Sequence, residues 1–76
     1  MQTTTRLPPL RAVREAQGLG LREAARLAGI NPAHLSQVEQ GKAMLSTRAL
    51  LRLARVLGLR ELDRLLSQFV TEPDGS

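Results

Sequence analysis

The hydrophobic positions of this chain recur with the spacing of a helix face. In residues 21–28 the apolar side chains fall at i, i+3, i+4 and i+7, the spacing of a single apolar stripe: Leu21, Ala24, Ala25, Ala28. The same spacing returns twice further along the chain, at Leu50, Leu53, Ala54, Leu57 and at Leu62, Leu65, Leu66, Phe69. Because each stripe must bury against another, the pattern predicts an all-α bundle.

Glycine, proline and cap residues between the stripes set the expected helix bounds. Gly29 supplies the positive φ that ends one helix, and Asn31 followed by Pro32 is a typical N-cap and first helical residue. Ser46 caps a later helix. The sequence therefore predicts a compact five-helix bundle, with helices over residues 10–17, 21–28, 32–40, 47–57 and 60–69.

The two ends of the chain lack this periodicity. Residues 1–9 end in a proline pair and are expected to form a flexible arm. Residues 71–76 carry no apolar anchor and are expected to be a disordered tail. The sequence thus predicts one domain, over residues 10–70.

Composition excludes several classes of protein. The 76 residues include no cysteine, so neither disulfides nor thiolate metal sites are available, and His34 is the only histidine. We expect no metal and no cofactor. No paired carboxylates or phosphate-binding glycine loop are present, so we expect no enzyme. The apolar runs are too short for a membrane span or a secretory signal, which predicts a cytoplasmic protein with no membrane partner.

The charge balance favours a polyanionic partner. The net charge is +4 and the pI is about 11.4, although basic ribosomal and membrane-surface proteins share this property. Of the 11 cationic residues, Lys42 is the only one that is not arginine. This arginine content is consistent with a GC-rich bacterial genome, so its abundance is weak evidence for phosphate binding.

The junction around Gly29 is the most informative part of the chain. Two helices joined by so short a turn form a helix-turn-helix, and the small Ala25 lets them cross closely. Leu35 and Val38 anchor the second helix to the core. Its outward residues are then Pro32, Ala33, Ser36, Gln37 and Gln40, with His34 beside them. Nine helical residues span roughly 13 Å, which fits the ~12 Å major groove of DNA.

These residues carry a family resemblance. Residues 10–66 resemble the lambda-repressor-like helix-turn-helix domain, the Cro/cI or XRE family of transcriptional regulators. The matching positions are Gly18-Leu19, Glu23, Ala25, Gly29-Ile30, Leu35, Ser36, Val38-Glu39, Gly41, Leu53-Ala54 and Leu57-Gly58-Leu59. The resemblance implies sequence-specific binding of duplex DNA by a bacterial regulator. We expect such a regulator to bind as a dimer on half-sites ~34 Å apart. It places residues 32–40 in the major groove and implies base contacts from Pro32, Ala33, His34 and Gln37.

Among these residues Gln37 has the best chemistry for reading a base. Its amide can form a bidentate pair with adenine, and its alternative role is that of a solvated side chain. Ala33 offers a methyl group to a thymine methyl, or is simply an exposed alanine. His34 contacts a phosphate or a base edge, or faces solvent.

A second set of residues is expected at the phosphates. The resemblance places Arg22 and Lys42 there, and Arg48 near the start of the helix over residues 47–57 is a further candidate. Ser36 and Gln40 are expected to donate to phosphates from the outer helix face, although each also fits an ordinary polar face. Arg52 and Arg55 continue the stripe of Arg48 but are expected on a plain solvated face. Arg6 in the arm either follows the DNA or has no role.

Glu39 is expected to be structural. It follows Leu35 by four residues and so leans inward, where a carboxylate needs a partner. The resemblance implies an ion pair between Glu39 and Arg14 of the first helix.

The sequence departs from the family at the start of the helix-turn-helix. Leu21 stands where a phosphate-binding glutamine is usual, and Gly20 replaces a serine or threonine cap. Pro32 and Ala33 replace longer polar readers, so specificity is expected to depend on Gln37 and on DNA shape.

The last helix leaves a second function open. Its stripe of Leu62, Leu65, Leu66 and Phe69 either closes the core or forms a surface for a homodimer or a protein partner. Leu51, Val56 and Leu59 lie outside the main stripes, and part of this apolar surface is expected to be exposed. The alternative to DNA binding is therefore a protein-binding module of the same fold, antitoxin-like or coactivator-like.

Overall fold

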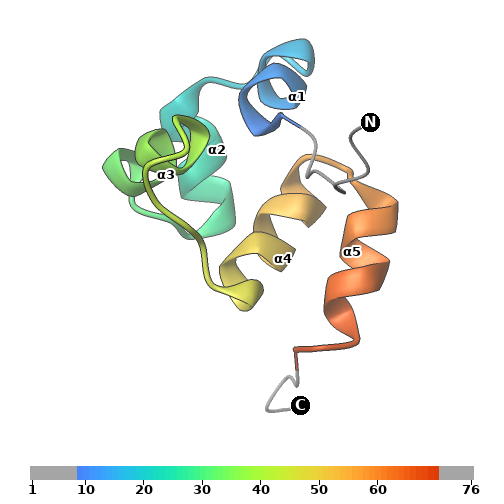
Figure 1. The fold of residues 1–76 in the computed structure, drawn as a ribbon. Helices are drawn as coiled ribbons and strands as arrows, with labels where there is room; N and C mark the ends of the chain where they lie inside the picture. Colours follow the sequence, from blue (N-terminus) through green and yellow to red (C-terminus); the bar gives the residue numbers. More distant parts are fainter. Residues whose placement is uncertain (1–8, 71–76) are drawn as a thin grey trace, which may run out of the picture.

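The computed structural model describes residues 9–70. This part of the chain forms five helices and no strand: α1 Leu10–Ala16, α2 Leu21–Ala28, α3 Pro32–Glu39, α4 Thr47–Val56 and α5 Arg60–Ser67 (Figure 1). The predicted all-α bundle is confirmed. Each helix begins at the predicted residue and ends within two residues of the predicted end.

α4 is the centre of the packing. It contacts α2 on one side and α5 on the other, and α2 in turn contacts α3 (Figure 1). The core is formed by buried side chains of α2, α3, α4 and the adjoining turns: Ala24, Ala25, Ala28, Ile30, Leu35, Leu53 and Leu57. All three buried residues of α2 are alanines, so the neighbouring helices can approach α2 closely.

α4 buries two faces, which the sequence pattern did not predict. Leu53 and Leu51 are each 1% exposed. Two residues apart on a helix, they lie about 160° apart around its axis. Of the three apolar residues outside the main stripes, Leu51 is therefore buried, and Val56 and Leu59 are half-buried. The reason is that α4 lies between α2 and α5.

α5 packs on α4 by one edge only. None of its residues is buried, and Leu62 and Leu66 are half-buried. Leu65 is 53% exposed, and Phe69, just after the helix, is 72% exposed. The stripe thus closes the bundle with two side chains and leaves the other two at the surface.

The predicted arm, apart from Pro9, and the predicted tail lie outside the described residues, as does Arg6. Within the described range, no helix has the length and the apolar character needed to cross a membrane.

Candidate functional site

The turn between α2 and α3 is set by Gly29. This residue has φ 69° and ψ 36°, the left-handed conformation that ends α2. The next amide, of Ile30, donates back to the carbonyl of Ala25 at 2.8 Å, and the Ile30 side chain is 8% exposed. The chain thus turns out of α2 within two residues, and the Ile30 side chain lies in the core.

The start of α3 is capped as its sequence predicts. The side chain of Asn31 accepts hydrogen bonds from the amides of Ala33, at 2.8 Å, and His34, at 3.3 Å. Pro32 occupies the first helical position, where its missing N–H leaves no donor unsatisfied. The first turn of α3 is therefore fixed by local hydrogen bonds.

The inner face of α3 is anchored at its middle and at its end. Leu35 is fully buried and Val38 is half-buried. At the last residue, Glu39 accepts two hydrogen bonds from the guanidinium of Arg14, at 2.8 and 2.9 Å. Arg14 also donates to the carbonyl of Leu19 at 2.9 Å, so one buried side chain joins α1, the loop after it and α3.

The ion pair between Arg14 and Glu39 is removed from water. The two side chains are 8% and 7% exposed. The hydrogen bonds that Arg14 donates to Glu39 raise the pKa of Arg14 above its ordinary value; burial opposes this, and the attraction of the Glu39 charge adds to it. Arg14 therefore stays charged, and the pair serves as a fixed support for α3.

The outer face of α3 carries the residues that the sequence predicted as DNA contacts. Pro32, Ala33, His34 and Gln37 are exposed. The Gln37 side chain forms no hydrogen bond with the described residues, so its amide is available to a ligand. His34 differs, because its Nε2 lies 3.1 Å from the carbonyl oxygen of Met44 in the loop after α3. Because a carbonyl oxygen can only accept, His34 donates this hydrogen bond from Nε2 and so links α3 to the loop.

Ser36 and Gln40 are brought together on the same face. The side-chain amide of Gln40 donates to the hydroxyl of Ser36 at 2.9 Å. Gln40 is exposed and Ser36 is half-buried. The pair therefore presents one linked polar group rather than two separate donors.

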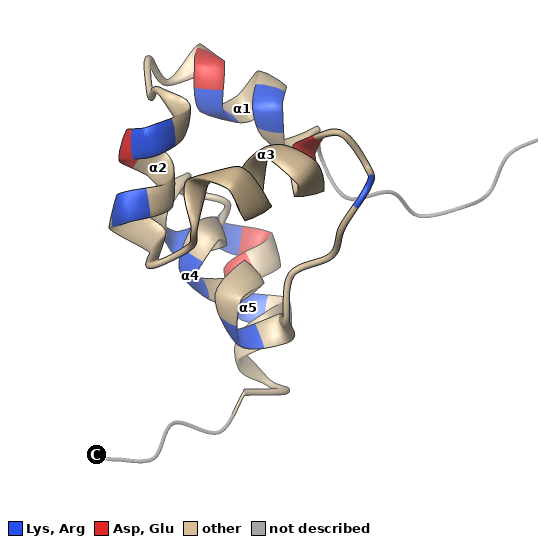
Figure 2. Cartoon of the chain, turned by 90° about the vertical axis from the view of Figure 1, so that its left-hand side faces the viewer, with Lys and Arg blue, Asp and Glu red and all other residues tan. Residues whose placement is uncertain are grey.

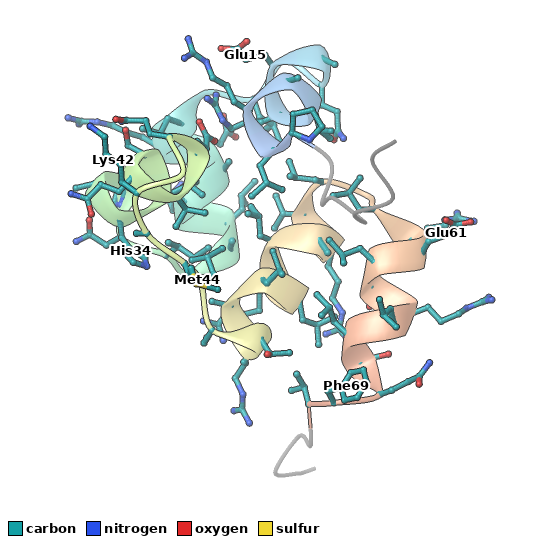
Figure 3. All side chains as sticks on the ribbon, in the orientation of Figure 1. Glu15, His34, Lys42, Met44, Glu61 and Phe69 are labelled. Carbon is teal, nitrogen blue, oxygen red and sulfur yellow. The ribbon has the colours of Figure 1, made fainter. Side chains whose placement is uncertain are left out.

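Cationic side chains lie on both sides of α3, which itself has none. In Figure 2 the Lys and Arg positions of α2 and of the loop that follows α3 lie on either side of α3, whose charged position is Glu39 at its end. The two cations that the sequence predicted as phosphate contacts here are Arg22, on α2, and Lys42, on the loop, and both are exposed. Lys42, His34 and Met44 lie on the α3 side of the molecule, away from Phe69 (Figure 3). Arg48, in the first turn of α4, is also exposed.

Two arginines of α4 have partners that the sequence did not predict. The Nε–H of Arg52 donates to the carbonyl of Ala28 at 3.0 Å, and the Nε–H of Arg55 donates to Asp63 of α5 at 3.2 Å. Both residues are exposed, as expected for a solvated face, but these two contacts were not predicted. The signal that was missed is the C-terminus of α2, whose last carbonyls favour a nearby cation.

A further side-chain contact ties α1 to the end of α4. The amide of Gln17 donates to the carbonyl of Leu57. In the described part of the chain, no three His, Cys, Asp or Glu side chains are grouped so that they could hold a metal ion. What the site offers is a rigidly supported helix with a small, polar and uncharged outer face.

Comparisons with known proteins agree with this arrangement. Residues 9–66 match a family model described as a helix-turn-helix domain. The chain is 37% identical, over 65 residues, to the HTH-type transcriptional regulator PuuR of Escherichia coli (strain K12) and to that of Shigella flexneri. The match covers 86% of this chain and 32% of each regulator, so the chain spans about a third of the length of these relatives. No solved structure matches the chain significantly.

Proposed function

The chain belongs to the helix-turn-helix domain family, and on this premise we propose that it binds duplex DNA in a sequence-specific manner as a bacterial transcriptional regulator. α3 enters the major groove. The observation that carries this proposal is the division of α3 into a face anchored by Leu35 and Glu39 and an outer face that is polar, uncharged and flanked by cations. The relatives at 37% identity bear the name of transcriptional regulators, which supports it.

Bases are read by the first turns of α3. Gln37 is the principal reader, because its exposed amide has no partner among the described residues and can pair with N6 and N7 of adenine. Ala33 and Pro32 offer apolar contacts to a thymine methyl group. His34 reaches a base edge or a phosphate only through its remaining ring nitrogen, since Nε2 is engaged by Met44.

Phosphates are contacted from both sides of the groove. Arg22 at the start of α2 and Lys42 after α3 flank the reading face, and Arg48 adds a contact from α4. Ser36 and Gln40 act together, since they are already hydrogen-bonded to each other. These contacts set the register of α3 and carry no sequence information.

The regulator acts as a homodimer on half-sites ~34 Å apart. The exposed Leu65 and Phe69, with the half-buried Leu62 and Leu66, supply an apolar surface on α5, on the side away from α3. A dimer formed there leaves both reading faces open. Such a regulator acts in the cytoplasm, at the nucleoid, and no small-molecule ligand or cofactor enters its proposed mechanism.

The same exposed side chains favour one alternative function. A protein-binding module, antitoxin-like or coactivator-like, would place its partner on Leu65 and Phe69 and leave α3 unused. The two functions differ in their response to salt. DNA binding weakens linearly in log salt, with a slope near the number of phosphates neutralised, whereas an apolar partner site hardly responds.

Selection from a pool of random duplexes tests the proposal. We expect an enriched motif of A·T-containing half-sites whose binding weakens steeply with salt. A pool with no enriched motif, together with salt-insensitive capture of a protein through α5, would contradict it.

A further inference from the structure

Arg52 closes the end of α2 from a different helix. Its Nε–H donates to the carbonyl of Ala28, the last residue of α2, at 3.0 Å. The last carbonyls of a helix have no donor within the helix. The two turn amides are used elsewhere, since Gly29 donates to Arg26 and Ile30 donates to Ala25. Arg52 thus donates to the Ala28 carbonyl, to which neither turn amide donates.

The guanidinium group also lies against the turn itself. A Cβ atom built on Gly29 would be 3.6 Å from Nε and 4.0 Å from Nη2 of Arg52. Its positive charge is favourable at this position because the C-terminus of a helix carries partial negative charge. Among the described residues Arg52 has no acidic partner, so the turn is its principal contact. Arg55, one turn further along α4, is different because it pairs with Asp63 of α5.

We propose that Arg52 is a positioning residue, which holds the turn between α2 and α3 against α4 and thereby fixes the direction in which α3 projects. The helix-turn-helix would otherwise be oriented by the alanine contacts of α2 and by the ion pair at the far end of α3. Arg52 supplies a polar, directional contact at the near end. The consequence for DNA recognition rests on the proposed function, whereas the effect on the turn does not.

Hydrogen exchange in the DNA-free protein tests the effect on the turn. Arg52→Met removes the donors and keeps the aliphatic stem, and Arg55→Met is the matched control on the same helix. We expect the amides of Gly29 and Ile30 to exchange about tenfold faster in Arg52→Met and at the wild-type rate in Arg55→Met. Arg52→Lys, which keeps a charged donor, should recover most of the protection.

Binding to the selected duplex tests the effect on recognition. In Arg52→Met the ratio of affinities for the selected and a random duplex should fall about tenfold. The salt slope should stay unchanged, because Arg52 contacts the turn and not a phosphate. A slope that falls by about one, with unchanged exchange at Gly29 and Ile30, would instead make Arg52 a phosphate contact and overturn the proposal.

The two readouts keep the proposals separable. A wild-type chain that does not discriminate between duplexes contradicts the proposed function, and the exchange rates still decide on Arg52. If Arg52→Met does not fold, a measurement on the wild-type protein tests the role of Arg52 instead. The Nε–H of Arg52 should then exchange more slowly than that of the exposed Arg60. Equal rates for the two groups would overturn the assignment.

Discussion

The guanidinium of Arg14 and the carboxylate of Glu39 meet in two hydrogen bonds, of 2.8 and 2.9 Å, that join α1 to the last residue of α3. Both side chains are almost removed from water. A buried charge without its partner is costly, so the pair makes the end of α3 dependent on α1. The helix that is proposed to read DNA is thus held from outside the two-helix motif.

Removing one member of this pair should be strongly destabilising. Glu39→Ala is expected to lower the free energy of unfolding by about 3–5 kcal/mol, because the Arg14 charge stays buried without a partner. The double variant Arg14→Met, Glu39→Leu should lose far less, since it leaves no buried charge. Urea unfolding followed by circular dichroism measures both.

The exposed pair of Arg11 and Glu15 is the control for this prediction. It has a similar Nε to carboxylate distance, 3.0 Å, but both side chains are more than half exposed. Arg11→Ala should cost less than about 1 kcal/mol. Equal losses for Glu39→Ala and Arg11→Ala would show that burial of the Arg14 pair contributes nothing.

The coupling between Arg14 and Glu39 should not change from neutral to mildly alkaline pH. The Glu39 hydrogen bond raises the pKa of Arg14, and a raised pKa gives stability that is fully present below the ordinary arginine value. That stability is lost only as the pH rises through the raised pKa. A double-mutant cycle at two pH values measures the coupling, and a fall at the mildly alkaline value would contradict the assignment.

Alanine substitutions at Gly29 and at Gly58 should have similar effects on stability but different effects on DNA selectivity. Both have φ 69°, so alanine at either position adopts a disfavoured conformation and should cost about 1–2 kcal/mol. Only Gly29 lies in the turn before α3. Gly29→Ala should therefore also weaken selective DNA binding, which thermal unfolding and binding titrations can compare. Equal effects of the two variants on selectivity would contradict this role of the turn.

The α5 surface should control self-association with little effect on folding. Because Phe69 is 72% and Leu65 53% exposed, Leu65→Glu with Phe69→Ser should leave unfolding nearly unchanged and shift a dimer to monomer. Sedimentation analysis reports the mass. Leu27→Ser, which alters an exposed leucine of α2, is the control and should leave the mass unchanged. If the Leu65→Glu, Phe69→Ser variant keeps the mass of the wild-type protein, the dimer does not form through α5.

The helices were predictable because their signals are local. Gly29, Asn31 and Ser46 act within one turn of their own position, so their roles can be inferred without knowledge of the packing. The burial of Leu51 could not be inferred, because a single apolar stripe does not reveal that α4 lies between two helices.

The candidate site was predictable to the same extent. The outward residues of α3 follow from the inward Leu35, since helix periodicity fixes one face once the other is known. The bonds of His34 to Met44 and of Arg52 to Ala28 could not be derived. Each joins segments whose relative placement depends on how the whole bundle packs.

The central claim, that α3 reads bases through Gln37, is tested most directly by the affinity of Gln37→Ala for the selected duplex. At one A·T pair of each half-site, wild-type protein should lose about 1–3 kcal/mol on replacement by G·C. Gln37→Ala should lose this discrimination at that pair and keep it at the other base pairs. Gln68 is an exposed glutamine at the end of α5, so the control variant Gln68→Ala should bind as the wild-type protein does. If Gln37→Ala discriminates at every base pair as strongly as the wild-type protein, α3 does not read bases through Gln37.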